Sequence, residues 1–219
     1  MSTPETVFPL GDDALGVTLA SKSRRNALAA YLLESGQWRE VIPGADGLSV
    51  QYDPASITPE TATKTLEKAL SADVIPKAPK TDVLVIPVCY DRAYALDMAH
   101  ICTLSTLSDD ELIARHTGTL HHVDMIGFTP GFAYLEGGDP ALDVPRLKTP
   151  RAHLPAGSIG VAGGLCGLYA LPGPGGWPII GRTPMVLFDT ALKDPFRLET
   201  GQNVRFEAIS TAEFESWVS

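Results

Sequence analysis

The chain has 219 residues, of which 44% are hydrophobic and 20% charged, and this suits a globular protein with one large or two small domains. A formal net charge of −9 disfavours nucleic acid and anionic membranes as partners. No stretch reaches the ~18 uninterrupted apolar residues of a membrane span, and the N-terminal residues lack the pattern of a signal peptide. We therefore expect a cytoplasmic protein.

Neither a disulfide framework nor a metal site is expected. The three cysteines, Cys89, Cys102 and Cys166, are far apart, odd in number and form no C-x-x-C pair. The histidines at 116, 121 and 122 match no metal-ligand spacing, and a helix-end histidine stabilised by the helix dipole is the simpler interpretation of the first.

The first segment predicts a strand followed by a helix. Residues 14–20 are short and partly β-branched, as in a strand. Residues 23–36 place Leu28, Tyr31 and Leu32 on one helical face and end at a glycine, Gly36.

The same order repeats further along. Residues 47–53 alternate apolar and polar side chains, which predicts a half-buried strand. Residues 58–70 predict a helix with Thr58 as N-cap and Pro59 in the first position. Strand, helix, strand, helix indicates a small open-sheet α/β domain.

A linker follows this domain. Residues 74–82 contain two prolines and two lysines without periodicity. We place the boundary near Lys80, so that an N-terminal α/β domain takes residues 1–79 and a second domain residues 80–219.

The second domain opens on a β-branched run at 83–91, with a helical pattern at 93–103. At 107–116, Ser108 and Glu111 form a capping box, and Leu107 and Leu112 have the spacing of a hydrophobic staple. A short helix to about His116 is predicted.

Beyond His116 the helical period disappears. Short apolar runs at 123–135, 157–171, 183–189 and 203–210 are separated by Gly and Pro, which predicts a β-barrel or sandwich. Gly and Pro concentrate between residues 127 and 184. They either line a site or make the tight corners of a small barrel.

Two motifs in this region resemble catalytic signatures and lack their context. Residues 176–183 read G-x-x-x-x-G-Arg-Thr, close to a phosphate-binding loop, but Pro184 and a strand-like run follow where a helix is needed. "AGSIG" around Ser158 resembles a nucleophile elbow, again without its helix. A turn-forming or substrate-binding hydroxyl is the better interpretation of Ser158.

Three arginines, Arg146, Arg151 and Arg182, each adjoin a proline or a glycine-rich turn. They either pair with carboxylates and fix the loops, or bind a carboxylate or phosphate through their planar forks. Aromatic residues are interleaved with them, which favours a pocket. These are Phe128, Phe132, Tyr134, Tyr169 and Trp177.

Residues 127–184, "GFTPGFAYLEGGDPALDVPRLKTPRAHLPAGSIGVAGGLCGLYALPGPGGWPIIGRTP", closely resemble one bacterial family. Its members are called the B subunit of 5-oxoprolinase, allophanate hydrolase subunit 1 or the inhibitor of a sporulation histidine kinase. The resemblance extends to "LGDDAL" near the start, "YDP" at 52–54, "IPVCYD" at 86–91 and "LIARHTG" around His116.

The resemblance implies an α+β protein with an N-terminal α/β domain and a cyclophilin-like C-terminal β-barrel. It implies a partner of related barrel type (the C subunit of 5-oxoprolinase, or allophanate hydrolase subunit 2) and, for 5-oxoprolinase, a third subunit. That complex opens 5-oxoproline to glutamate with consumption of ATP. The near-miss loop is not expected to hold that ATP, since the family motif itself has arginine at position 182.

No catalytic residue can be assigned from the resemblance. We expect the arginines to hold a substrate carboxylate and the backbone N–H groups of the Gly163–Gly164 turn to stabilise an oxyanion. The predicted substrate-binding set is Phe128, Phe132, Tyr134, Arg151, Ser158, Gly163, Gly164, Tyr169, Trp177, Arg182 and Thr183.

One departure from the family bears on the substrate. Leu165 and Cys166 stand where relatives commonly have Gln and Thr, which removes hydrogen-bonding groups. Leu147, which stands where relatives often have a second arginine, is a smaller departure. Either the substrate differs or the protein is a divergent paralogue, or both sites face the barrel core. Three functions stay open: a subunit of an ATP-dependent amidohydrolase that acts on C–N bonds other than peptide bonds and is inactive alone, a histidine-kinase inhibitor, and a peptide-binding barrel.

Overall fold

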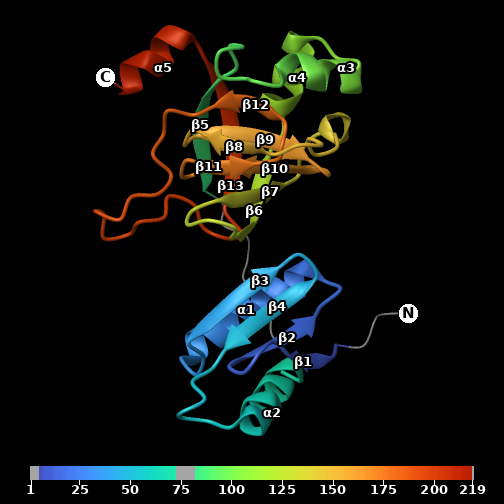
Figure 1. Ribbon diagram of the computed structural model, residues 1–219, viewed down its shortest axis with the longest axis vertical. Coiled ribbons are helices and arrows are strands. Elements are labelled where there is room, and N and C mark those ends of the chain that lie inside the picture. Colours follow the sequence, from blue (N-terminus) through green and yellow to red (C-terminus); the bar gives the residue numbers. More distant parts are fainter. Residues whose placement is uncertain (1–4, 73–81, 219) are drawn as a thin grey trace. The chain divides into compact units, whose positions relative to one another are not determined.

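The computed structural model describes residues 5–72 and 82–218 (Figure 1). Backbone contacts divide the chain into two compact units, Met1–Ala78 and Pro79–Ser219. The predicted boundary near Lys80, and all of the predicted linker except Asp82, lie outside the described residues, so the boundary stays a prediction.

The N-terminal unit contains a four-stranded antiparallel sheet in the order β1-β2-β4-β3. The predicted strands are confirmed as β2 (Ala14–Thr18) and β4 (Gly47–Gln51). Two strands were not predicted, β1 (Val7–Pro9) and β3 (Glu40–Gly44). Both are edge strands without a buried residue, so they lack the alternation of buried and exposed side chains that marks a half-buried strand.

Both predicted helices of this unit are confirmed, α1 (Lys22–Ser35) and α2 (Pro59–Leu70). Thr58 caps α2, and Gly36 ends α1 in the left-handed conformation, with φ 64°.

The predicted buried face of α1 is partly wrong. Leu28 and Leu32 are buried, but Tyr31 is 45% exposed. The buried face is centred on Arg25, Leu28 and Leu32, and Tyr31 lies roughly 100° around the helix from that centre. The Arg25 side chain is buried there because Nη1 donates a 2.7 Å hydrogen bond to the carbonyl oxygen of Gly44 in β3.

The second unit is a closed barrel in the order β10-β7-β6-β13-β5-β12-β9, which confirms the predicted barrel and the α+β class (Figure 1). Strands β13 and β5 pair in parallel, and the other neighbours are antiparallel. The strands are β5 (Val83–Cys89), β6 (His121–Ile126), β7 (Ala133–Glu136), β9 (Ser158–Ala162), β10 (Leu165–Leu168), β12 (Ile179–Arg182) and β13 (Asn203–Ile209).

Two other predictions for this unit need correction. The run at 183–189 is irregular apart from an isolated bridge between Phe188 and Phe196. The helix predicted at 93–103 begins only at Met98, as α3 (Met98–Ser105). The preceding residues form turns, because the Asp91 side chain and carbonyl accept hydrogen bonds from the backbone N–H groups that follow.

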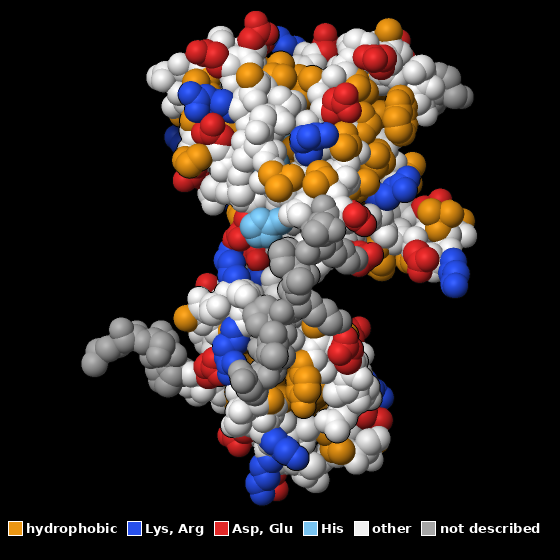
Figure 2. Space-filling view, turned by 180° about the vertical axis from the view of Figure 1, so that it is seen from behind, with side chains coloured by type: hydrophobic (Ala, Val, Ile, Leu, Met, Phe, Trp, Pro, Cys, Tyr) orange, Lys and Arg blue, Asp and Glu red, His pale blue; other side chains and the backbone are white. Residues whose placement is uncertain are grey.

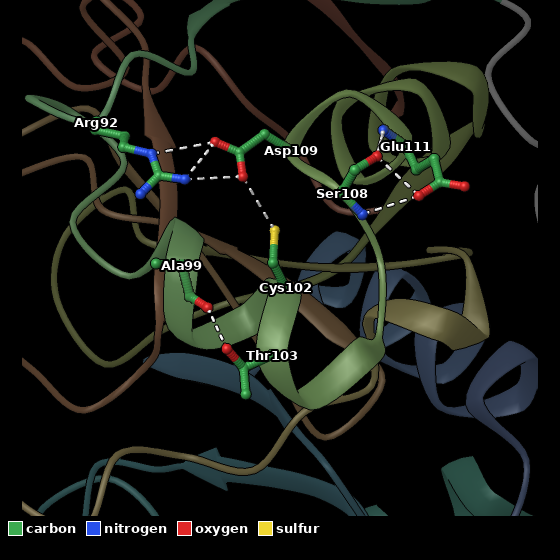
Figure 3. Close-up of polar contacts among 7 residues, drawn as sticks. All are labelled: Arg92, Ala99, Cys102, Thr103, Ser108, Asp109 and Glu111. Carbon is green, nitrogen blue, oxygen red and sulfur yellow. Dashed lines mark hydrogen bonds and ion pairs between the residues drawn. The ribbon is translucent and has the colours of Figure 1, made fainter.

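Helix α4 (Asp109–Gly118) has the predicted capping box, drawn in Figure 3. The Glu111 carboxylate accepts the backbone N–H of Ser108 at 2.8 Å, and Ser108 Oγ accepts the N–H of Glu111 at 3.3 Å. Beside it, Asp109 binds Arg92 and accepts a hydrogen bond from the thiol of Cys102 (Figure 3). This helix packs against β13 and so covers one side of the barrel.

A two-stranded sheet, β8 (Arg151–Leu154) with β11 (Gly173–Gly175), lies outside the closed barrel. The last helix, α5 (Thr211–Val218), contacts β5. None of the helices in residues 5–72 and 82–218 is long and apolar enough to cross a membrane.

Candidate active site

A cavity of about 320 Å³ opens on the barrel unit, and it brings together the five predicted aromatic residues. Three segments of the chain form it, residues 128–134, 146–150 and 169–177. The lining residues are Phe128, Phe132, Tyr134, Arg146, Leu147, Pro150, Tyr169, Pro174, Gly175, Gly176 and Trp177.

The floor of the cavity is a set of aromatic rings in edge-to-face contact around Phe132. Its ring centre lies 4.7 Å from that of Tyr134, 4.9 Å from that of Tyr169 and 6.2 Å from that of Trp177. Phe132 is only 1% exposed. Edge-to-face pairs are favoured by the ring quadrupoles, so the floor is a fixed apolar surface.

Two glycines make room for these rings. A Cβ atom at Gly167 would lie 2.9 Å from Phe132 Cζ and 3.0 Å from Trp177 Cζ3, and one at Gly175 would lie 2.5 Å from the Tyr169 hydroxyl oxygen. Any side chain at either position would displace a ring. Some of the glycine richness of residues 127–184 therefore serves the aromatic floor.

Phe128 stands at the rim in a strained conformation. Its φ is 68°, a region that residues other than glycine rarely adopt, and its side chain is 64% exposed. The turn is held by hydrogen bonds from Gly127 N to the Phe132 carbonyl (3.1 Å) and from Phe132 N to the Thr129 carbonyl (3.0 Å). Strain at an exposed aromatic residue is characteristic of a functional position.

Arg146 is the cation of the cavity. Its guanidinium carbon lies 5.5 Å from the ring centre of Trp177, within cation–π range. Among the described residues, no carboxylate or carbonyl partner is found for it. A guanidinium over an indole face keeps its N–H edges free for an anion.

The two tyrosines add neutral donors. Burial raises the pKa of Tyr134, with Arg146 acting in the opposite direction. Burial also raises the pKa of Tyr169, against a hydrogen bond from the Trp177 backbone. Both phenols therefore keep their protons at neutral pH and can donate hydrogen bonds to a ligand.

The other two arginines point to internal partners. Arg151 forms a bidentate ion pair with Asp97, at 2.9 and 2.7 Å. Arg182 donates from Nε to the Ala156 carbonyl at 2.8 Å, and its guanidinium lies 5.6 Å from the ring centre of Phe214. Neither lines the cavity. All three arginines had the same local signal in the sequence, so the sequence did not distinguish Arg146, which the predicted binding set omitted.

The remaining predicted binding residues also lie outside the cavity lining. Ser158 Oγ donates to the Pro155 carbonyl at 2.7 Å, and Thr183 Oγ1 accepts the backbone N–H of Met185 at 3.1 Å. Gly163 and Gly164 form the β9–β10 turn with φ of 58° and 74°. The N–H of Gly163, expected to serve an oxyanion, is donated to the Val144 carbonyl at 3.0 Å.

A second polar cluster is buried inside the barrel around His116. Its Nδ1 lies 2.6 Å from the Tyr90 hydroxyl and its Nε2 3.5 Å from Cys166 Sγ. Burial lowers the pKa of His116 well below its ordinary value, and nearby His121 adds to this. His116 is thus a neutral core residue, and the helix-dipole interpretation, which needs a charged ring, is wrong.

Cys166, one of the residues that depart from the family pattern, faces this core and not the cavity. Leu147 lines the cavity, so the expectation that both departing sites face the core is wrong for Leu147. Among the described residues, no group of three His, Cys, Asp or Glu side chains is placed to hold a metal ion.

Comparison with known proteins places this geometry in a family. The pattern of the carboxyltransferase domain, subdomains C and D, matches residues 6–198. The chain is 32% identical to the B subunit of 5-oxoprolinase from Bacillus subtilis (strain 168), over 99% of this chain and 98% of that protein. It is 35% identical to the B subunit of 5-oxoprolinase from Escherichia coli O157:H7, over 87% of each chain.

Solved structures agree. The crystal structure of TTHA0988 superposes with a TM-score of 0.78 at 30% identity, over 90% of this chain and 40% of that one. This chain thus spans well under half of the length of TTHA0988. The crystal structure of PH0987 from Pyrococcus horikoshii, a conserved uncharacterized protein, gives a TM-score of 0.60 at 34% identity, over 95% of this chain and all of the other. Urea carboxylase of Kluyveromyces lactis shares the fold at 15% identity, with a TM-score of 0.75.

Proposed function

Because the chain belongs to the carboxyltransferase-domain family that includes the B subunit of 5-oxoprolinase, we propose that it is part of a 5-oxoprolinase complex. The observation that carries this proposal is the full-length match to the Bacillus subtilis protein, at 32% identity over 99% of this chain. The family resemblance drawn from the sequence motifs is confirmed by the same comparisons.

The proposed reaction opens the lactam of 5-oxoproline. Water adds across the ring amide to give glutamate, and ATP hydrolysis to ADP and phosphate drives the otherwise unfavourable opening. This chain's contribution is to bind the substrate: the cavity offers an apolar floor, one cation at Arg146 and two neutral phenolic donors. These groups match a small, flat, anionic ring compound.

The complex needs further subunits in this proposal. A related barrel protein and a third subunit would supply the ATP site, since residues 176–183 have the wrong structure for a phosphate-binding loop. Residues 179–182 form β12, and the next helix along the described chain starts only at Thr211.

Exposed hydrophobic side chains on the barrel unit support association with another subunit. They include Leu120 (52% exposed), Val186 (62%) and Trp217 (57%). Figure 2 shows hydrophobic side chains spread over one face of this unit. An apolar surface of this kind is typical of an interface.

The test is ATP-dependent release of glutamate from 5-oxoproline. This chain is assayed alone, with its two proposed partner subunits, and in a mixture from which only this chain is omitted. We expect activity in the full mixture alone. Activity that persists without this chain would contradict its role in the complex, and allophanate as the better substrate would assign it to the related hydrolase.

A further inference from the structure

We propose that the cavity selects ring carboxylates whose nitrogen is uncharged, binds their carboxylate at Arg146, and excludes amino acids that carry an ammonium group. The inference rests on the proposed function for the identity of the natural ligand, 5-oxoproline. It goes further in assigning the site, the residue that recognises the anion and the basis on which substrate is distinguished from product.

Of the three arginines, Arg146 is the one whose guanidinium group is available to a ligand. Arg151 and Arg182 use their guanidinium groups inside the protein, on Asp97 and on the Ala156 carbonyl. Arg146 lies on the rim over Trp177, exposed and without an anionic partner among the described residues. Its fork can therefore take a ligand carboxylate in a bidentate pair.

The size and shape of the cavity suit a single small ring. Its volume of about 320 Å³ lies near the lower end of ligand pockets, which span about 300–1,000 Å³. The floor consists of the rings of Phe132, Tyr134 and Tyr169. A single small ring fits between this floor and the rim, with its flat face on aromatic carbon and its carboxylate toward Arg146.

The hydroxyl groups of Tyr134 and Tyr169 are neutral hydrogen-bond donors of the cavity. The phenol of Tyr134 keeps its proton because burial raises its pKa, and Tyr169 already accepts a hydrogen bond from the Trp177 backbone, so its own hydroxyl proton is left to donate. A lactam carbonyl accepts hydrogen bonds, whereas an ammonium group can only donate them. The donors thus suit a lactam.

The lining of the cavity also disfavours a ligand with a positive charge. None of the described residues that line the cavity is acidic. An ammonium group would be desolvated beside the like charge of Arg146, with no carboxylate among the described lining residues to offset the cost. Glutamate and proline both carry such a group, and 5-oxoproline does not. The cavity would accept the lactam and release the amino acid that its hydrolysis produces.

The experiment is titration calorimetry on the full chain with three probes: 5-oxoproline, proline and 2-pyrrolidone. The last has the lactam ring without the carboxylate. We expect saturable binding of 5-oxoproline, with proline and 2-pyrrolidone each at least about tenfold weaker, the loss that corresponds to one charge-assisted interaction. Pyrrole-2-carboxylate, a ring carboxylate with an uncharged nitrogen, should bind as well.

The variant Arg146→Met keeps the apolar stem and removes the charge, and we expect at least about a tenfold loss of 5-oxoproline affinity. Arg146→Lys should recover part of it. Arg205→Met is the matched control: it removes the same charge from an exposed position on β13, outside the cavity, and should bind as the unmodified chain does. Circular dichroism checks that each variant is folded.

The outcomes separate this inference from the proposed function. If the assembled complex hydrolyses 5-oxoproline and Arg146→Met neither weakens binding nor raises KM, the inference is overturned and the function stands. If the complex does not hydrolyse 5-oxoproline while the chain binds pyrrole-2-carboxylate in an Arg146-dependent way, the inference stands and the function fails. Proline binding as tightly as 5-oxoproline, or no probe binding to either the chain or the complex, overturns the inference.

Discussion

Arg151 and Asp97 form a bidentate ion pair that holds three parts of the barrel unit together. The two N–O distances are 2.9 and 2.7 Å, and Asp97 also accepts the backbone N–H of Ile179 at 2.7 Å. The carboxylate lies just before α3, the guanidinium comes from β8, and Ile179 begins β12. Since Asp97 is only 8% exposed, these partners replace the water contacts that its carboxylate loses on burial.

Arg151→Ala should therefore lower stability and leave ligand binding intact. Removing the guanidinium leaves a nearly buried carboxylate with one fewer charged partner, and a loss of about 1–3 kcal/mol in the free energy of unfolding is expected. The Arg151 side chain is 31% exposed, so solvent screening holds the loss to this range. Chemical denaturation and calorimetry with 5-oxoproline measure the two effects.

Arg92→Ala is the control for that variant. Arg92 also forms a pair with an aspartate, Asp109, but the two side chains are 64% and 40% exposed, so the cost should stay below about 1 kcal/mol. Lost ligand binding with unchanged stability in Arg151→Ala would return Arg151 to the binding site.

Phe128 and Phe132 should respond in opposite ways to substitution. Phe132 is buried, so Phe132→Ala should cost about 3–5 kcal/mol of unfolding free energy. Phe128 is mostly exposed with a φ of 68°, and Phe128→Asn should stay within about 1 kcal/mol of the original stability, because asparagine tolerates this conformation. Phe128→Asn should still weaken 5-oxoproline binding. A large loss of stability in Phe128→Asn would show a structural role instead.

The parts of the fold that were predicted correctly have local causes. The capping box of Ser108 and Glu111 needs only residues within one helical turn, and Gly36 ends α1 because glycine adopts the left-handed conformation without strain. β1 and β3 were missed because neither edge strand contains a buried residue, although each pairs with the next strand along the chain. The order of the barrel strands was not predicted, because a pairing such as that of β13 with β5 leaves no local pattern in the sequence. The family resemblance implied only the type of barrel.

In the candidate site, too, only the features with a local sequence pattern could be predicted. Aromatic residues in a glycine-rich stretch predict a pocket, and Phe132, Tyr134 and Trp177 do line one. Which arginine faces it depends on where acidic partners lie, and Asp97 is 54 residues from Arg151 in the chain. The sequence therefore indicated an arginine site and not the particular arginine.

Cysteine reactivity should differ sharply between the native and unfolded chain. Cys89 and Cys166 are buried, and burial strongly raises the pKa of the Cys166 thiol. Cys102 is half-buried. Burial and its hydrogen bond to Asp109 both raise the pKa of its thiol, so its reaction with the reagent should be slow. With a disulfide reagent at pH 8, we expect at most one thiol to react in the native protein and three in denaturant.

The variant Asp109→Asn should make Cys102 more reactive. Removing the negative charge beside Cys102 should lower the pKa of that thiol and increase its rate of modification, while the two buried thiols stay unreactive. Rapid reaction of three thiols in the native protein would contradict the closed barrel interior.

Stability should fall in mild acid because of the neutral histidine inside the barrel. Burial lowers the pKa of His116 below that of the unfolded chain, about 6.5, and lowers the pKa of His121 in the same direction. The unfolded state then binds more protons below pH 6.5, so this contribution to stability is complete above that pH and lost as the pH decreases. Between pH 7 and 5, His116 alone should reduce the unfolding free energy by on the order of 1–2 kcal/mol.

The measurement is urea denaturation at half-unit steps from pH 5 to 7.5. In this range the carboxyl groups with lowered pKa, such as Asp53 and Glu111, stay charged in the native state and add little to the slope. His116→Gln should flatten the dependence on pH, whatever it costs at pH 7. His153→Gln, at an exposed position on β8, should keep it. Equal slopes in the unmodified chain and His116→Gln would mean that protons enter the native barrel.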